Sequence, residues 1–269
     1  MKTSWLFDVD GVLSNSVTKK VQELQIFNEL VNRLEKGDVI GLNTGRSLDF
    51  IVSKILDPLE NVLKDKNLLK SIFAIGEKGA VWVTYNKKGI RTEHLNSQIS
   101  VPNKLQAEVR KVVSYPPFSD VMFYDESKKT MITIEMTINK NHGKFLKLQQ
   151  QLVHDFENLL IKMNIINDFK IDVFRIATDI QSKNVGKAYA TKKFTELLTA
   201  NQIFPNKYIC FGDDKADYQM YEELKRLGKK AKLVFVGEKE KLEGKNLQDV
   251  VFTKKHLDEG TLEYLQSSQ

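Results

Sequence analysis

The chain has 269 residues, of which 41% are hydrophobic and 28% charged, and its formal net charge is +6 at pH 7. This indicates a globular protein with room for one large domain or two modest ones. No apolar run approaches the roughly 18 residues of a membrane span, no secretory hydrophobic segment opens the chain, and a single cysteine excludes an internal disulfide. We therefore expect a cytoplasmic protein, a monomer or homodimer, without a membrane partner.

The lysines are scattered along the chain and mixed with acidic residues. Neither an arginine-rich helix nor an alternation of aromatic and basic residues typical of RNA binding is present. We expect no nucleic-acid partner, and a mildly basic protein would suit a small anionic substrate.

The first third of the chain alternates apolar strand patterns with helical ones. The expected elements are a strand at 3–8, a helix at 19–35, a strand at 38–44, a helix at 47–56 with Pro58 just beyond it, a strand at 71–76, and a hairpin at 80–91 that turns at 86–89. Strands that alternate with helices predict a parallel sheet covered on both faces.

The middle of the chain, about 97–182, has a different pattern. It predicts a helix at 101–113, a hairpin at 121–137, a long helix at 142–163 and two short strands within 169–181. This αββαββ order is typical of a self-contained unit with an antiparallel sheet.

After residue 183 the alternating pattern returns. The expected elements are a helix at 186–200, a strand at 207–214, a helix at 217–228, a strand at 231–237, a strand at 249–253 and a helix at 258–266. The simplest interpretation is an α/β core formed by 1–96 and 183–269, interrupted by an inserted α+β domain at 97–182.

Asp8 and Asp10 follow the first apolar strand in the stretch WLFDVDGVLS. Ligands of open α/β sheets bind at the carboxyl ends of the strands, so we expect Asp8 to lie at a ligand-binding site. Two neighbouring carboxylates repel each other unless a cation lies between them, and Mg²⁺ prefers oxygen ligands. Two exposed aspartates in a turn are the alternative interpretation of this short pattern.

A second acidic cluster, KYICFGDDKADYQM, repeats the arrangement of apolar strand, glycine and carboxylates. Asp213, Asp214 and Asp217 could face the first pair of aspartates across the end of the sheet. Asp214 or Asp217 could instead cap the following helix, which is a common structural role.

Two further segments suit a phosphate group. Thr44 lies in NTGRS after the second strand, where its hydroxyl and the N–H groups of the turn through Gly45 and Arg46 could bind phosphate oxygens. Lys187 opens a helix directly after the inserted module, and a lysine there adds a point charge to the positive end of the helix dipole.

With these four segments the sequence resembles the haloacid dehalogenase (HAD) superfamily of phosphohydrolases. DVDGV matches its first motif, Thr44 its second, Lys187 its third and GDDKAD its fourth. The resemblance implies a Rossmann-like core with a C2-type cap, and GDDKADYQM is similar to the branch that contains trehalose- and sucrose-phosphate phosphatases. The segment GEKGAVW lacks a histidine-glycine pattern expected in a close trehalose-phosphate phosphatase relative, so the sugar stays open.

The resemblance implies a role for each matched residue. Asp8 would be the nucleophile and Asp10 the acid/base that protonates the leaving alcohol. The Asp8 carboxylate, the Asp10 main-chain oxygen and Asp213 would hold Mg²⁺, supported by Asp217 and Asp214. Thr44, Gly45, Arg46 and Lys187 would bind the phosphoryl group.

The sequence thus predicts a Mg²⁺-dependent phosphatase that acts on a small phosphorylated metabolite, with a sugar phosphate as the favoured class. Two alternatives stay open. A phosphomutase would return the phosphoryl group to the substrate, and a binding or regulatory protein would keep the fold without turnover.

Overall fold

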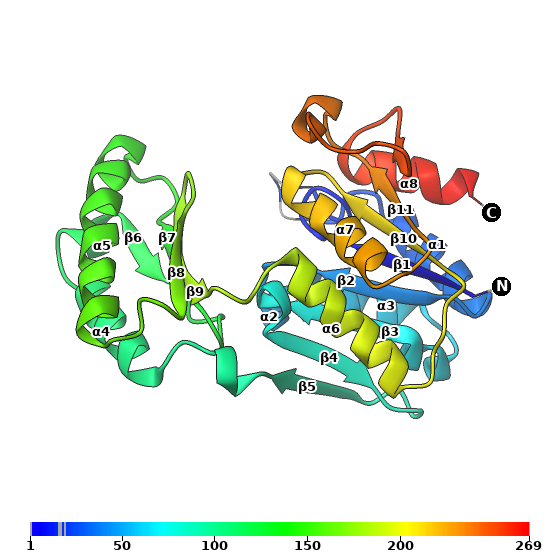
Figure 1. The fold of residues 1–269 in the computed structure, drawn as a ribbon, viewed down its shortest axis with the longest axis horizontal. Coiled ribbons are helices and arrows are strands. Elements are labelled where there is room, and N and C mark those ends of the chain that lie inside the picture. Colours follow the sequence, from blue (N-terminus) through cyan, green and yellow to red (C-terminus); the bar gives the residue numbers. More distant parts are fainter. Residues whose placement is uncertain (1, 16–17, 19, 269) are drawn as a thin grey trace. The chain divides into compact units, whose positions relative to one another are not determined.

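The computed structural model describes residues 2–15, 18 and 20–268 of the chain (Figure 1). By its internal contacts the chain divides into two compact units. The core unit comprises residues 1–94 and 186–269, and the cap unit comprises residues 95–185. The assignment of residues 1–96 and 183–269 to a hydrolase core and of residues 97–182 to a cap domain stays a prediction.

An eight-stranded sheet forms the centre of the core unit. Its strands, in spatial order, are β12 (Val250–Phe252), β11 (Ala231–Phe235), β10 (Lys207–Gly212), β1 (Thr3–Phe7), β2 (Val39–Asn43), β3 (Ile72–Gly76), β4 (Val81–Tyr85) and β5 (Arg91–Leu95). The six strands from β12 to β3 are parallel, and β4 pairs antiparallel with β3. The predicted mainly parallel sheet is confirmed.

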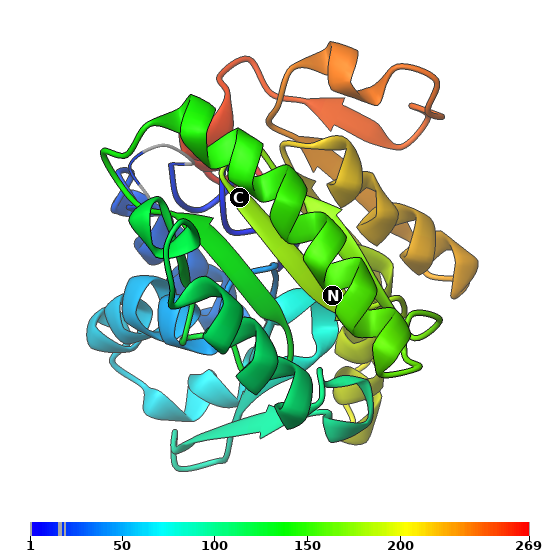
Figure 2. The same cartoon turned by 90° about the vertical axis from the view of Figure 1, so that its left-hand side faces the viewer.

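Helices cover both faces of this sheet because its strands are apolar on both sides (Figures 1 and 2). Trp5 and Phe7 of β1 belong to one hydrophobic cluster, and Leu6 between them belongs to the other. The first cluster includes side chains of α1 (Gln25–Glu35), α2 (Leu48–Ile51), α3 (Asp57–Val62) and α8 (Leu257–Ser267). The second includes side chains of α6 (Lys187–Ala200) and α7 (Tyr218–Arg226).

Two predicted helices differ from the observed ones. The first begins at Gln25, so the prediction of a helix from residue 19 was wrong over residues 20–24, and Lys19 lies outside the described residues. The N–H of Asn15 donates to the carbonyl of Lys20, which closes a loop there, and Leu24 is 67% exposed. The second helix does not end before Pro58 but continues to Val62. Residues 52–56 form a π-helical turn just before the proline, which lacks an N–H and stands in the first turn of α3.

The cap unit has the predicted αββαββ order and a four-stranded antiparallel sheet. Its elements are α4 (Asn103–Val113), β6 (Met122–Tyr124), β7 (Ile132–Met136), α5 (His142–Lys162), β8 (Phe169–Val173) and β9 (Ala177–Ser182). Both helices pack on the same face of the sheet, where they bury a hydrophobic cluster that includes Leu105, Phe156 and Ile180 (Figures 1 and 2). In the part of the chain that the structure describes, every helix is too short or too polar to cross a membrane.

Candidate active site

The candidate site lies where the order of the core strands reverses. From β1 the chain passes to β2 and β3 on one side of the sheet, and β10 later pairs with β1 on the other side. Phe7 is level with Phe211, and the N–H of Asp8 donates to the carbonyl of Phe211 over 3.0 Å. Asp8 and Asp213 therefore follow adjacent strand ends at a topological switch point, the usual ligand site of such sheets.

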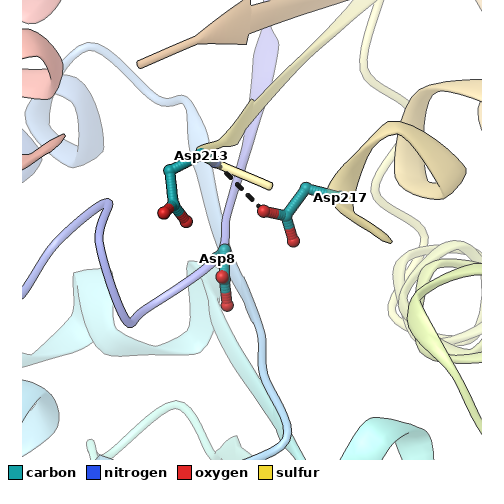
Figure 3. Close-up of side chains that lie close together, drawn as sticks. All are labelled: Asp8, Asp213 and Asp217. Carbon is teal, nitrogen blue, oxygen red and sulfur yellow. Dashed lines mark hydrogen bonds between the residues drawn. The ribbon is translucent and has the colours of Figure 1, made fainter. Parts of the chain in front are cut away.

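Three predicted carboxylates meet there (Figure 3). Asp8, Asp213 and Asp217 each offer a carboxylate oxygen, and these oxygens lie within 4.8 Å of one another. Asp8 is 9% exposed and Asp217 is 1% exposed. One oxygen of Asp217 accepts the backbone N–H groups of Asp213 and Asp214 over 3.0 and 3.1 Å, which fixes this carboxylate against the loop. We call these three residues the acidic triad.

Lys187 neutralises part of this buried charge. Its ammonium group lies 2.6 Å from a carboxylate oxygen of Asp8 and 2.8 Å from one of Asp217, and it donates to the carbonyl of Asn43 over 2.8 Å. Lys187 is the first residue of α6, so the helix start and the end of β2 together fix its position. Three carboxylates and one ammonium group give the cluster a formal charge of −2.

Glycines let the backbone approach the triad closely. Gly11 has a φ of +78°, and a Cβ atom there would lie 2.6 Å from the carboxylate carbon of Asp213. A Cβ atom at Gly237 would lie 2.1 Å from the carbonyl oxygen of Asp213. Glycine at these positions is therefore a steric condition for placing Asp213 beside Asp8.

Burial and mutual repulsion disturb the titration of the cluster. Burial raises the pKa of Asp8 well above its ordinary value, and the charge of Asp217 raises it further, while Lys187 opposes the change. Burial and the charge of Asp217 also raise the pKa of Asp213 to about 6. Burial alone would lower the pKa of Lys187, but the charges of Asp217 and Asp8 raise it above its ordinary value. The raised pKa values of Asp8 and Asp213 mean that burial and the charge of Asp217 destabilise their ionised forms, which a nearby cation would stabilise.

The triad fits a divalent cation by its chemistry. Its donors are hard carboxylate oxygens, which Mg²⁺ prefers, and they converge closely enough to share one ion. A net negative charge remains after Lys187 and the more exposed Lys241, which lies 3.8 Å from Asp213, are counted, and a bound cation would offset it. Asp8, Asp213 and Asp217 could therefore hold it, and the contribution of the Asp10 main-chain oxygen stays a prediction.

The side chain of Asp10 lies apart from this cluster in a contact of its own. Its two carboxylate oxygens accept hydrogen bonds from the guanidinium group of Arg46 over 2.7 and 2.9 Å. The Arg46 group also stacks over the ring of Phe50, 4.7 Å from its centre. The structure thus orients the predicted acid/base Asp10 through Arg46, a residue expected from the sequence to bind phosphate.

Thr44 and Gly45 lie at the predicted turn after β2. Leu42 is level with Phe7, so Thr44 stands one position beyond the level of Asp8. Its buried hydroxyl oxygen accepts the N–H of Arg46 over 3.2 Å, and its own N–H donates to the carbonyl of Ile75. Among the residues that the structure describes, no acceptor takes the hydroxyl proton of Thr44, so it can be donated to a ligand. The role of Gly45 stays a prediction.

Asp214 takes the structural role that the sequence left open. Its carboxylate accepts the N–H of Ala216 over 3.2 Å, and with Asp217 it forms a capping box at the start of the turn before α7. Its side chain is 61% exposed. The structure does not bring Asp214 into the acidic triad.

Comparison with known proteins identifies the family. The sequence profile of the haloacid dehalogenase-like hydrolases matches residues 53–227, more than half of the chain. The protein is a HAD-like hydrolase. The matched range contains Lys187 and the second acidic cluster, and Asp8 and Thr44 lie before it. No curated protein sequence gives a significant match.

Solved structures share the fold of this HAD-like hydrolase at low sequence identity. The C-terminal domain of a C. albicans trehalose-6-phosphate phosphatase is 15% identical, with a TM-score of 0.66 over 99% of this chain and 91% of its own. A haloacid dehalogenase-like hydrolase from Bacteroides thetaiotaomicron is 14% identical, with a TM-score of 0.66 over the whole of both chains. Trehalose-6-phosphate phosphatase from Aspergillus fumigatus is 14% identical, with a TM-score of 0.58 over 99% of this chain and 92% of its own.

Two contacts of this hydrolase were missed by the sequence reasoning. The ammonium group of Lys241 donates to the carbonyl of Asp213 over 2.9 Å, and no local pattern around Lys241 announces this. The side chain of Asn43 donates to the carbonyl of Lys187 and to the hydroxyl of Thr191 over 2.9 and 3.0 Å. Asn43 opens the NTGRS stretch, so its position at a strand end was a signal that could have found it.

The cap unit of this HAD-like hydrolase has a polar face of its own. Thr133 and Asp179 alternate with the apolar residues that face α4 and α5, so they lie on the opposite side of the cap sheet, where they share a hydrogen bond of 2.8 Å. Asp172, on the same side, accepts a hydrogen bond from Gln181 and forms a salt bridge with Lys170. The carbonyl oxygen of the Gln181 side chain is buried and has no hydrogen-bond partner among the described residues.

Proposed function

We propose that this HAD-like hydrolase is a Mg²⁺-dependent phosphatase that releases phosphate from a small phosphorylated metabolite through an aspartyl-phosphate intermediate. The observation that carries the proposal is the convergence of Asp8, Asp213 and Asp217 around a formal charge of −2 beside Lys187. Elements far apart in sequence contribute these groups, and a net negative, buried cluster is costly without a cation.

In the proposed first step, an oxygen of Asp8 attacks the phosphorus atom. The new O–P bond forms while the bond from phosphorus to the leaving oxygen breaks, and Asp10 gives its proton to that oxygen. In the second step, Asp10 takes a proton from a water molecule, whose oxygen forms a bond to phosphorus. The Asp8–phosphorus bond then breaks, which returns Asp8 and releases inorganic phosphate.

The remaining residues position and neutralise the reacting groups. When bound, Mg²⁺ would offset the negative charge of the carboxylate and phosphoryl oxygens. Lys187 adds a fixed positive charge 2.6 Å from Asp8, and the hydroxyl of Thr44 can donate to a phosphoryl oxygen. Arg46 holds the carboxylate of Asp10 by two hydrogen bonds, which favour its ionised form, the form that takes the proton from water in the second step.

A sugar phosphate is the proposed substrate class. The fold is shared with trehalose-6-phosphate phosphatases from two fungi, at 14% and 15% identity. The cap unit, taken by itself, carries on its polar face carboxylate, amide and ammonium groups of a kind that binds sugar hydroxyls. The proposed location is the cytoplasm, because the single cysteine, Cys210, is a free and buried thiol.

The test is phosphate release from a panel of sugar phosphates and one aryl phosphate. We expect activity with Mg²⁺, none with EDTA, and recovery when excess Mg²⁺ is returned. Asp8→Asn should lower the turnover number by at least about 10³-fold, because it removes the attacking oxygen. Asp49→Asn, on an exposed residue of α2, is the matched control and should keep normal turnover.

Two results would contradict the proposal. Full activity of Asp8→Asn would exclude Asp8 as the nucleophile. An unchanged thermal unfolding midpoint of this variant would show that a loss of turnover is not a loss of folding. Isomerisation of a sugar phosphate in the presence of its bisphosphate, without phosphate release, would indicate a phosphomutase instead.

A further inference from the structure

A second charged region lies at the amino ends of the core strands, opposite the acidic triad. A cavity of about 330 Å³ opens beside β1, β10 and β11, in the size range of small-molecule sites. Its charged lining consists of four lysines and one carboxylate: Lys207, Lys225, Lys230, Lys232 and Asp249. We call it the lysine cavity, and its lining carries a formal charge of +3.

Most of this positive charge has no counter-charge in direct contact. The carboxylate of Asp249 lies 3.2 Å from the ammonium group of Lys225. Within residues 2–15, 18 and 20–268, no carboxylate forms a salt bridge with Lys207, Lys230 or Lys232. An anion that entered the cavity would meet three ammonium groups that form no salt bridge among the described residues, although the charge of Lys232 also acts on Asp249.

Helix capping explains only one of these lysines. Lys225 stands in the last turn of α7, where a cation stabilises the helix dipole. Lys207 and Lys232 belong to strands, and their neighbours in the sheet are Thr3 and Ile209. This register places both on the face of the sheet that carries Trp5, although a strand requires no lysine there.

The rest of the cavity wall is aromatic and aliphatic apart from Ser268. Trp5, Ile209 and Tyr264 line it together with the lysines. Trp5 is held in place because its indole N–H donates to Asp38 over 2.8 Å and the guanidinium group of Arg33 covers its ring. Tyr264 is half-buried, so part of its ring can contact a ligand. Trp5 and Ile209 are only 4% and 5% exposed, so Tyr264 offers most of the apolar surface, which a bare inorganic anion would leave unused.

We propose that the lysine cavity binds a small phosphorylated compound with a flat apolar part, at a site separate from the acidic triad. The lysine ammonium groups would bind the phosphate oxygens, and the apolar part would lie against Tyr264 and the edge of Trp5. This site does not depend on the proposed phosphatase activity, because it shares no residue with the acidic triad.

The test uses Trp5 as the reporter and phenylphosphonate as the probe. Phenylphosphonate joins a phosphate-like group to a ring through a P–C bond, so a phosphatase does not consume it. The chain has two tryptophans, and Trp82→Phe leaves Trp5 as the reporter; Trp82 lies on β4 and stacks on His94. EDTA removes metal ions, so the triad stays negative and repels the probe.

Phenylphosphonate should change the fluorescence of Trp5 in a saturable way. In Lys207→Gln/Lys232→Gln, the dissociation constant should rise about tenfold, because two exposed charge contacts are lost. Lys87→Gln/Lys88→Gln, in the turn between β4 and β5, is the matched control and should bind normally. Methylphosphonate, which lacks the ring, should bind more weakly than phenylphosphonate, and higher salt should weaken both.

Three results would overturn the proposal. The first is that phenylphosphonate does not bind saturably to the Trp82→Phe protein with its lysine cavity unchanged. The second is binding that survives Lys207→Gln/Lys232→Gln but is lost in Lys187→Gln, which would locate the probe at the acidic triad. The third is equal binding of methylphosphonate and phenylphosphonate, which would exclude a role of the apolar wall. Matching thermal unfolding midpoints of the lysine variants would show that the loss of binding is not a loss of folding.

Discussion

The charged side chains at the two ends of the core sheet differ in burial and in pairing. At the carboxyl ends of β1 and β10, Asp8 and Asp217 are buried, and the ammonium group of Lys187 lies 2.6 Å from Asp8 and 2.8 Å from Asp217. At the amino ends of β10 and β11, Lys207, Lys230 and Lys232 are exposed and form no salt bridge with the described residues.

Burial explains why the two ends should respond differently to substitution. A buried charge that loses its partner keeps its desolvation penalty, so the free energy of unfolding depends on every member of the cluster. Solvent screens the exposed lysines, so each contributes little to stability and stays available to a ligand. We therefore expect substitutions at the buried end, the proposed reaction site, to change stability far more than substitutions at the exposed end.

The largest expected effect comes from removing one charge at each end. Lys187→Met leaves Asp8 and Asp217 without their shared cation, so the metal-free protein should lose about 3–5 kcal/mol of unfolding free energy near pH 7.5. Lys232→Met at the opposite end should stay within about 0.5 kcal/mol of the natural protein. Urea denaturation measures both. Equal losses in the two variants would contradict the contrast between the ends.

A steric comparison tests how the triad is held. Gly11→Ala and Gly228→Ala both place a side chain on a left-handed backbone, at φ of +78° and +69°. This strain should cost about 1–2 kcal/mol in each. Only at Gly11 would the new Cβ also clash with Asp213, since nothing lies within 4 Å of a Cβ at Gly228.

Gly11→Ala should therefore be the less stable variant and should also bind Mg²⁺ more weakly. Urea denaturation and calorimetry give the two readouts. Normal Mg²⁺ binding by Gly11→Ala would show that Asp213 need not stand beside this glycine.

The pH dependence of Mg²⁺ stabilisation should show a smaller effect. The folded-state pKa of Asp8 is raised and that of Asp213 is raised to about 6, so the folded metal-free protein holds these protons more tightly than the unfolded chain. Their contribution to stability is therefore lost as pH rises through these folded-state values. The increase in unfolding temperature on adding Mg²⁺ should be larger near pH 7.5 than near about pH 5. A larger increase at the acidic pH would reverse the expected sign.

Much of the fold could be predicted because its signals are local. Buried parallel strands such as β10 are continuous apolar runs, and long helices such as α5 show a clear apolar period. The start of α1 was missed because the apolar Val21 and Leu24 continue the helical period into a loop. The π-helical turn before Pro58 has no comparable sequence signal.

The site was predictable where residues follow strand ends, as Asp8, Asp213 and Thr44 do. The partner of each side chain was not. That Arg46 holds Asp10 and that Lys241 donates to the Asp213 carbonyl depend on side-chain positions set by loops, whereas the capping role of Asp214 was one of the two alternatives given by the sequence. Such contacts join residues that are far apart in the sequence, so the spacing of the residues does not predict them.

The central claim is that Asp213, and not its neighbour Asp214, completes a divalent-cation site with Asp8. Calorimetric titration of Mg²⁺ into the natural protein, Asp213→Asn and Asp214→Asn tests it without any substrate. We expect Asp213→Asn to bind Mg²⁺ at least about tenfold more weakly, because a charged oxygen donor is lost, and Asp214→Asn to bind as the natural protein does. Normal Mg²⁺ binding by Asp213→Asn, or its loss in Asp214→Asn alone, would contradict the account.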